Sequence, residues 1–334
     1  MSWEQTEICY YSGNSHLTDS LKLTMLAKPH FRFKQFSVWH DQCAMKVSTD
    51  GILLGAWASI TPNTKKVLDI GTGTGLLSLM LSQRLQSQHS NKTNPNTRTP
   101  TNIEQQVRLQ SDISATDISI TAVELDQLAA NQASFNFDQS PWNNLLNVVN
   151  DDIRSWNEQT TDKFDLIVCN PPYFSDSLIG DDNARNKARH NDSLPFGDLL
   201  AVVKSRLKDN GTFELILPCD EALTFLNLAA DLAFKKLALT YVKTTPNKAP
   251  SRTLIKLGLK TGSFEGHNNT NLHPPVENVD VDVDVDVDVD VDVDVDVDVD
   301  VDVDVDEVII RDENGKYSAK FTNFCRAFYL KMSD

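Results

Sequence analysis

Short apolar runs alternate with stretches of helical spacing through the middle of the chain. The first run, residues 66–70, leads into Gly71-Thr72-Gly73-Thr74-Gly75, after which apolar residues recur three or four positions apart from Leu76 to Leu85. Four later runs have the length and composition of buried strands: residues 118–124, 146–149, 164–169 and 212–217. Helical spacing returns between them, at residues 128–137 and 199–207.

This order of elements predicts an α/β fold of the Rossmann-like, doubly wound type, with a mostly parallel sheet and helices on both faces. Two further runs, residues 237–242 and 254–259, are expected to add an antiparallel hairpin at the C-terminal side of the sheet. We expect residues 61–262 to form this domain and residues 307–334 to add a C-terminal strand and helix.

Two segments interrupt the pattern. Residues 86–117 are rich in Ser, Asn, Gln and Thr and predict a polar surface loop of low complexity. Residues 279–306 are an unbroken Val-Asp repeat. A strand would align all its aspartates on one face, where like charges repel, so we expect disorder rather than an ordered hairpin. Calcium binding is a weaker third reading, because no turn residues shape a coordination sphere.

The repeat dominates the charge of the chain. The 334 residues carry a formal net charge of −16, but without the 14 aspartates of the repeat 33 acidic residues face 31 basic ones, a net charge of −2. The first residues lack a basic and apolar leader and no run is long enough to span a membrane, which predicts a cytoplasmic protein. Five scattered cysteines without a C-x-x-C pair predict free thiols, with neither a disulfide framework nor a zinc site.

Candidate ligand-binding residues follow the expected strands, where doubly wound sheets bind ligands. Gly71, Gly73 and Gly75 allow a tight turn that brings backbone close to a ligand. Glu124 ends the second strand, where an acid can accept hydrogen bonds from ribose hydroxyls. Asp152, after the third strand, could accept from an adenine amino group or could cap a helix.

The most informative motif is Asn170-Pro171-Pro172-Tyr173, directly after the run at residues 164–169. Two prolines fix the backbone and remove two N–H donors, so the motif presents a stiff cluster of acceptors at the end of a strand. Such a cluster can hold a planar amino group that is about to be alkylated. The chain lacks the phosphate-binding loops of dinucleotide and triphosphate enzymes, and an adenosyl ligand without phosphates fits best.

In this order, the segment Val67–Gly75, Glu124, Asp152 and the Asn-Pro-Pro-Tyr motif resemble the class I S-adenosylmethionine-dependent methyltransferases that methylate exocyclic or amide nitrogens. The resemblance implies S-adenosyl-L-methionine as the cofactor and places Asp69 in its binding site. It also implies that the Asn170 side-chain oxygen and the Pro171 carbonyl each accept an N–H bond from the target amine. Pro172 would stiffen the turn, and Tyr173, supported by Phe174, would stack on the base.

A narrower resemblance involves residues 31–36, 40–57, 139–142 and 327–330. They are similar to the bacterial adenine-N6 methyltransferase family that modifies the adenine next to the anticodon of valine tRNA. The similarity implies that residues 1–60 pack over the site and that Lys46, Thr49 and Asp50 lie over the methionine end of the cofactor. Alternatively, Thr49 or Asp50 simply caps the following helix.

Basic residues fit an RNA substrate, which the resemblance implies to be the anticodon stem-loop of tRNA(Val). Residues 235–260 carry seven Lys or Arg and no acid. The expected phosphate contacts are Lys243, Lys248, Arg252, Arg185 and Arg189. A solvated surface is the alternative reading of any one of them. We expect a monomer that binds neither membrane nor DNA.

Three alternatives share this fold. A glutamine-N5 protein methyltransferase would use the same motif, but it calls for a large helical N-terminal domain, and only about 60 residues precede the first strand. An rRNA or DNA amino-methyltransferase is a second alternative, although a DNA enzyme needs a target-recognition region that the polar inserts would supply poorly. A catalytically dead RNA-binding module should have lost Asn170 or the glycine turn, and both are present.

Overall fold

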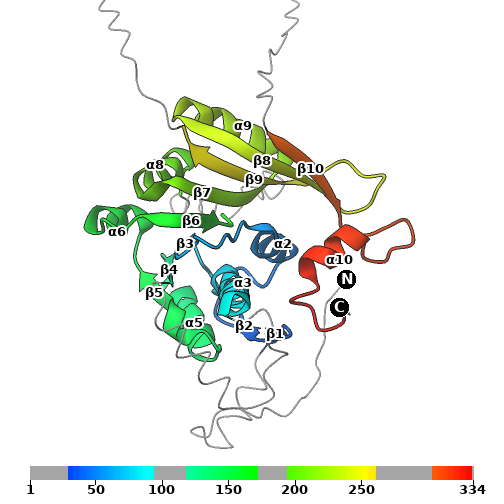
Figure 1. Cartoon of the computed structure of the whole chain (residues 1–334), viewed down its shortest axis with the longest axis horizontal. Helices are drawn as coiled ribbons and strands as arrows, with labels where there is room; N and C mark the ends of the chain where they lie inside the picture. Colours follow the sequence, from blue (N-terminus) through cyan, green and yellow to red (C-terminus); the bar gives the residue numbers. More distant parts are fainter. Residues whose placement is uncertain (1–28, 94–117, 172–193, 261–302, 333–334) are drawn as a thin grey trace, which may run out of the picture.

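The computed structural model describes residues 29–93, 118–171, 194–260 and 303–332. An eight-stranded sheet with the order β10-β8-β9-β7-β6-β3-β4-β5 runs through these residues (Figure 1). Its central strands are mutually parallel: β3 (Lys66–Ile70), β4 (Ser119–Glu124), β5 (Leu146–Asn150), β6 (Phe164–Cys169) and β7 (Leu207–Pro218). The sheet continues as the antiparallel hairpin of β8 (Phe234–Lys243) and β9 (Arg252–Leu259) and ends at β10 (Asp304–Ile309), which is parallel to β8. The predicted mostly parallel sheet and its antiparallel hairpin are confirmed.

Helices cover both faces of this sheet, each over its own apolar core (Figure 1). One face carries α2 (Thr49–Trp57), α3 (Leu76–Thr93), α5 (Gln127–Asp138) and α10 (Ala319–Cys325). The other carries α6 (Ile153–Gln159), α8 (Phe196–Arg206) and α9 (Cys219–Asp231). The doubly wound architecture is therefore as expected from the alternation of strand and helix. A short 3-10 helix, η1 (Asn143–Leu145), leads into β5.

The pairing of β3 with β6 positions the two main motifs. Ile70, the last residue of β3, is the register partner of Cys169, the last residue of β6. The glycine turn after Ile70 and the described start of the Asn-Pro-Pro-Tyr motif, Asn170 and Pro171, therefore leave the same edge of the sheet from adjacent strands. In a parallel sheet this is the edge at which ligands bind.

An N-terminal ribbon lies against the C-terminal end of the described chain. Its strands are β1 (His30–Arg32) and β2 (Ser37–Trp39), which pair antiparallel. Phe33 forms a β-bridge with Tyr329, and the Lys34 amide donates to the Phe328 carbonyl at 2.8 Å. Residues 31–36 and 327–330, which both resemble the methyltransferase family, thus pack together as one structural unit.

The first polar insert begins later than expected. Helix α3 continues to Thr93, eight residues into the range 86–117 that predicted a loop. Its polar side chains find partners there, since Gln86 accepts from the Trp142 indole N–H and Gln88 Nε2 donates to the Ile60 carbonyl at 2.8 Å. Composition alone does not reveal such contacts. Residues 94–117 lie outside the described part of the chain.

The Val-Asp repeat contributes the first half of β10. Residues 304–306 of the range 279–306 are paired with β8, whereas residues 279–302 lie outside the described part. Asp306 forms an ion pair with Lys320, and Glu307 pairs with Lys243 at 2.7 Å. Val308 is fully buried and fixes which residues of this strand face the core. The C-terminal strand therefore starts inside the repeat.

Within the described residues, no helix combines the length and apolar character that a membrane crossing requires.

Two deletions test where the repeat ends as a structural element. Removing residues 279–302 leaves all of β10, and we expect urea denaturation to give an unchanged free energy of unfolding. Removing residues 279–306 takes three ladder residues and the partner of Lys320 from the sheet edge. The free energy of unfolding should then fall by about 1–2 kcal/mol, the net value of a few edge-strand hydrogen bonds and an exposed ion pair. Equal stability of the two deletions would contradict a structural role for residues 304–306.

Candidate active site

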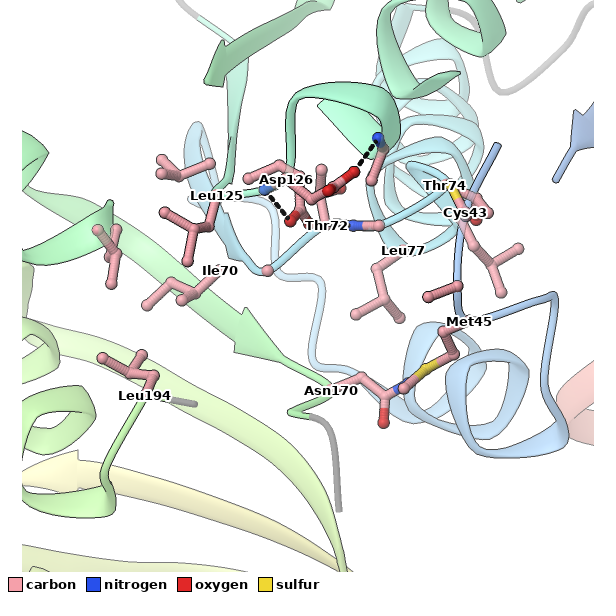
Figure 2. A pocket seen from close by; sticks show the side chains of 18 of the residues that line it. Cys43, Met45, Ile70, Thr72, Thr74, Leu77, Leu125, Asp126, Asn170 and Leu194 are labelled. Atoms are coloured by element: carbon pink, nitrogen blue, oxygen red, sulfur yellow. Dashed lines mark hydrogen bonds between the residues drawn. The ribbon is translucent and has the colours of Figure 1, made fainter. Parts of the chain in front are cut away.

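A cavity of about 280 Å³ lies at the carboxyl ends of the parallel strands, where β3 and β6 end side by side (Figure 2). Its walls come from the segment before α2, from the glycine turn, from the turn between β4 and α5, and from the start of α6. Asn170 and Leu194 complete it, with Leu194 across the cavity from Thr74 (Figure 2). The strand ends that the sequence singled out therefore surround one cavity.

The glycine turn needs glycine at each of its three positions. Gly71, Gly73 and Gly75 have φ values of +68°, +56° and +81°, in the left-handed region that other residues avoid. A Cβ on Gly75 would lie 2.4 Å from the Phe137 ring. The Gly71 amide donates to the Val123 carbonyl at 2.9 Å, which ties the turn to the end of β4. The turn is thus a fixed part of the cavity wall.

Asp69 supports this turn from behind. Its side chain is fully buried, and Oδ2 accepts from the Thr72 hydroxyl at 2.6 Å and from the Ser78 hydroxyl at 2.7 Å. Oδ1 has no hydrogen-bond partner in the described part of the chain. Burial raises the pKa of this carboxyl to about 6, against the opposing effect of the two hydroxyls. Asp69 does not line the cavity, so its direct contact with a cofactor stays a prediction.

Glu124 does line the cavity, and its carboxylate holds two backbone segments in place. Oε2 accepts from the Gly73 amide at 2.8 Å, and Oε1 accepts from the Asp126 amide at 3.0 Å. Each carboxylate oxygen can accept a second hydrogen bond. The predicted contact with ribose hydroxyls is therefore compatible with this arrangement and stays a prediction.

Asp152 caps α6, which is one of the two roles that the sequence predicted for it. It is the N-cap of α6, accepts from the Arg154 amide at 2.8 Å, and forms an ion pair with the Arg154 guanidinium at 2.6 Å. The hydrogen bonds from the Arg154 guanidinium are the main cause that lowers the pKa of Asp152, and the bond from the Arg154 amide lowers it further. The residue also lines the cavity, so the contact with an adenine amino group stays a prediction.

Asn170 stands at the cavity beside the start of α2. Its Nδ2 approaches the Met45 sulfur at 4.0 Å (Figure 2). A Cβ added to Gly51 of α2 would lie 3.7 Å from Asn170 Nδ2. Pro171 is buried directly after it. The remaining residues expected from this region, Pro172, Tyr173, Phe174, Arg185 and Arg189, lie outside the described residues.

The sequence has close relatives of known kind, although it matches no protein-family model. It is 44% identical over 230 residues to the tRNA1(Val) (adenine(37)-N6)-methyltransferase of Bacteroides thetaiotaomicron, covering 69% of this chain and 84% of the relative. It is 37% identical over 302 residues to the protein of the same name from Pseudoalteromonas translucida, covering 90% of this chain and 99% of the relative. The chain belongs to the tRNA1(Val) (adenine(37)-N6)-methyltransferase family.

A solved structure agrees with this assignment at the level of the fold. A predicted O-methyltransferase, Atu636 from Agrobacterium tumefaciens, aligns with a TM-score of 0.50 at 12% identity and covers 84% of this chain and 96% of its own. This likeness concerns the fold alone, and it agrees with the Rossmann-like α/β fold expected from the sequence.

The family resemblance implied a cofactor contact for three residues at and just before the start of α2: Lys46, Thr49 and Asp50. Lys46 lines the cavity, whereas Thr49 is the exposed first residue of α2. The alternative interpretation, in which Thr49 or Asp50 caps this helix, is wrong. Ser48 is the N-cap, and its hydroxyl accepts from the Gly51 amide at 3.2 Å. Asp50 is instead bonded to the Arg252 Nε at 2.9 Å.

Two of the expected phosphate contacts have acidic partners within the protein. Arg252 pairs with Asp50, and Lys243 pairs with Glu307 at 2.7 Å. Lys248 is exposed in the turn between β8 and β9. Both acidic partners lie outside residues 235–260. The net positive charge of that range is therefore larger than the positive charge that the folded surface offers to RNA. Contacts of all three residues with RNA stay predictions.

Several cavity residues carry no sequence signal of their own. Cys43 and Met45 line the wall before α2, and Leu125 lines it directly after Glu124. Only Leu125 could have been found, because it follows an acid at a strand end. Burial, helped by Glu124 and neighbouring acids, raises the pKa of Cys43 to about 12, so its thiol stays protonated at neutral pH. No group of three metal-ligating side chains occurs in the part of the chain that the structure describes.

The raised pKa of Asp69 predicts a pH dependence of stability. The folded protein holds a proton on Asp69 up to about pH 6, whereas the unfolded chain releases it near the ordinary value of 3.8. Stability is therefore lost as the pH rises through this window. Asp69→Asn keeps an oxygen for Thr72 and Ser78 but cannot titrate. Between pH 5 and pH 7, urea denaturation should show a decrease in unfolding free energy that is smaller by roughly 1 kcal/mol in the variant. Identical pH profiles would contradict this role of burial.

Proposed function

We propose that this protein transfers the methyl group of S-adenosyl-L-methionine to the exocyclic N6 amine of adenine 37 in the anticodon loop of tRNA(Val). Its family relatives are named for this reaction. The observation that carries the proposal is the position of Asn170. Its carboxamide stands at the cavity formed by the glycine turn and Glu124, where an amine held by the motif would face a bound cofactor.

The residues of the cavity fit an adenosyl group without phosphates. Glu124 offers carboxylate oxygens for ribose hydroxyls, and Ile70 and Leu125 offer apolar walls for a purine ring. Lys46 also lines the cavity, and its ammonium group can meet the carboxylate of the methionine moiety. When bound, the cofactor supplies an electrophilic methyl group on a sulfonium.

The Asn-Pro-Pro-Tyr motif would prepare the amine for attack. An adenine amino group is a weak nucleophile because its lone pair is delocalised into the ring. Acceptance of its two N–H bonds by the Asn170 side-chain oxygen and the Pro171 carbonyl favours a pyramidal nitrogen and directs the lone pair at the methyl group. No separate base is needed, since the methylated amine is acidic and releases its proton afterwards. The protonated thiol of Cys43 is consistent with this scheme.

Base and RNA contacts complete the proposal. Tyr173 would stack on the extruded adenine, with Phe174 behind it. Arg185, Arg189 and Lys248 would meet phosphates of the anticodon stem-loop. Lys243 and Arg252 would do so by exchanging their internal acidic partners for phosphate. The monomeric state and the cytoplasmic location expected from the sequence stay predictions.

Asn170→Ala tests the role of the motif. We expect transfer of labelled methyl groups to unmodified valine tRNA to be lost, while calorimetry gives a cofactor Kd within a few-fold of wild type, because the variant removes an acceptor for the amine and leaves the glycine turn intact. Asn170→Asp, which keeps two acceptor oxygens, should retain measurable activity. Asn144→Ala, an exposed asparagine outside the cavity, is the matched control and should be fully active.

Mapping the methyl group at nucleotide resolution tests the substrate. The proposal expects N6-methyladenine at position 37 of valine tRNA. Transfer to a release-factor peptide but not to tRNA would replace this substrate with a protein glutamine. An active Asn170→Ala variant would instead remove the motif from the mechanism.

A further inference from the structure

Two amide side chains on α5 hold the chain that leads from the N-terminal ribbon into the cavity wall. Asn136 is fully buried, and its Oδ1 accepts from the Trp39 amide at 3.0 Å while its Nδ2 donates to the Trp39 carbonyl at 2.9 Å. One helical turn earlier, Gln132 is 5% exposed, and its Oε1 accepts from the Gln42 amide at 3.2 Å. Together they bind the backbone on either side of His40 and Asp41.

Asn136 also reaches the opposite part of the site. Its second Nδ2 hydrogen donates to the Thr74 carbonyl at 2.8 Å, within the glycine turn. Thr74 lines the cavity, and so does Cys43, four residues after Trp39. In Figure 2 both lie on the side of the cavity away from Leu194. One carboxamide therefore uses both of its protons and its oxygen to join the ribbon to the turn.

This linkage acts at the cofactor cavity rather than at the fold as a whole. The ribbon has other attachments, among them the Lys34 bond to Phe328 and the edge-to-face contact between Trp39 and Phe135. The glycine turn is likewise held by Glu124 and by the end of β4. Loss of the carboxamide would leave each part attached to the sheet but would release one from the other. Their relative placement sets the width of the cavity that lies between residues 43–46 and the turn.

We propose that Asn136 and Gln132 are positioning residues that preorganise the cofactor cavity by fixing residues 40–48 against the glycine turn. The inference rests on the proposed function only in taking the cofactor to be S-adenosyl-L-methionine. A preorganised cavity binds its ligand without the cost of ordering the wall at the moment of binding. Neither residue lines the cavity, so each acts through the backbone that it holds.

The test measures cofactor binding by calorimetry, in the absence of RNA, for full-length variants. Asn136→Leu keeps a similar volume and removes all three hydrogen bonds, and we expect the Kd for S-adenosyl-L-methionine to rise at least tenfold. Gln132→Met removes a single bond and should raise it about threefold. Gln132→Glu keeps the acceptor for the Gln42 amide and should bind more tightly than Gln132→Met.

Ser140→Ala is the matched control for a merely structural role. Ser140 is a buried polar residue just after α5, and its hydroxyl bonds only locally, to the Phe137 carbonyl at 2.8 Å and from the Trp142 amide at 3.2 Å. The variant should lower the melting temperature and leave the Kd unchanged. If Asn136→Leu behaves in the same way, the proposal is overturned.

Steady-state kinetics and hydrogen exchange provide the second readout. In Asn136→Leu, the KM for the cofactor should rise while kcat at saturating cofactor stays within about threefold of wild type. Amide exchange of residues 42–46 should be faster than in wild type without cofactor and should return to the wild-type rate with it. A fall in kcat with an unchanged KM would contradict preorganisation. If Asn136→Leu does not fold, the comparison of Gln132→Met with Gln132→Glu decides. Binding measured without RNA keeps this test separate from the identity of the methyl acceptor.

Discussion

The parallel pairing of β3 with β6 is the constraint on which the site depends. Because Ile70 and Cys169 are register partners at the ends of these strands, the glycine turn and Asn170 emerge next to each other at one edge of the sheet. A shift of either strand by one residue would exchange its two faces and carry one motif away from the other. The apolar side chains that fill the cores on both faces of β3 and β6 prevent such a shift.

Polar contacts of α2 and α5, most of them outside the cavity, hold the segment before α2 in place at the cavity. At the start of α2, Ser48 caps the helix and Asp50 pairs with Arg252. At its end, the Trp57 indole donates to Thr240 at 3.1 Å, and the Ser59 amide donates to the buried Glu214 at 2.8 Å. These directional contacts fix the helix lengthwise, which apolar packing alone does less well. The same logic applies to Asn136 on α5, where one buried carboxamide aligns two cavity walls.

The fold and the location of the site could be predicted from the sequence because the signals are local. Alternating strand and helix, three glycines at a turn and two prolines after a strand each act through the backbone of their own segment. The roles of individual polar residues could not be predicted in the same way. For Asp152 the sequence allowed two equally plausible roles, and nothing in the sequence pattern distinguished Ser48 as the cap of α2. Residues 304–306 of the Val-Asp repeat belong to a strand because they pair with the edge of β8 and because Lys320 on α10 forms an ion pair with Asp306.

The sequence by itself determined the order of the elements, the parallel sheet and the chemical groups at its carboxyl edge, since each follows from periodicity and turn residues within a few positions. Only the tertiary structure decided which charges are paired and which segments are joined. Arg252 meets Asp50 across 202 positions, and Asn136 meets Trp39 across 97. The physical reason is that hydrogen bonds and ion pairs require distances near 3 Å, and only the packing of the whole chain brings residues so far apart in sequence to that distance.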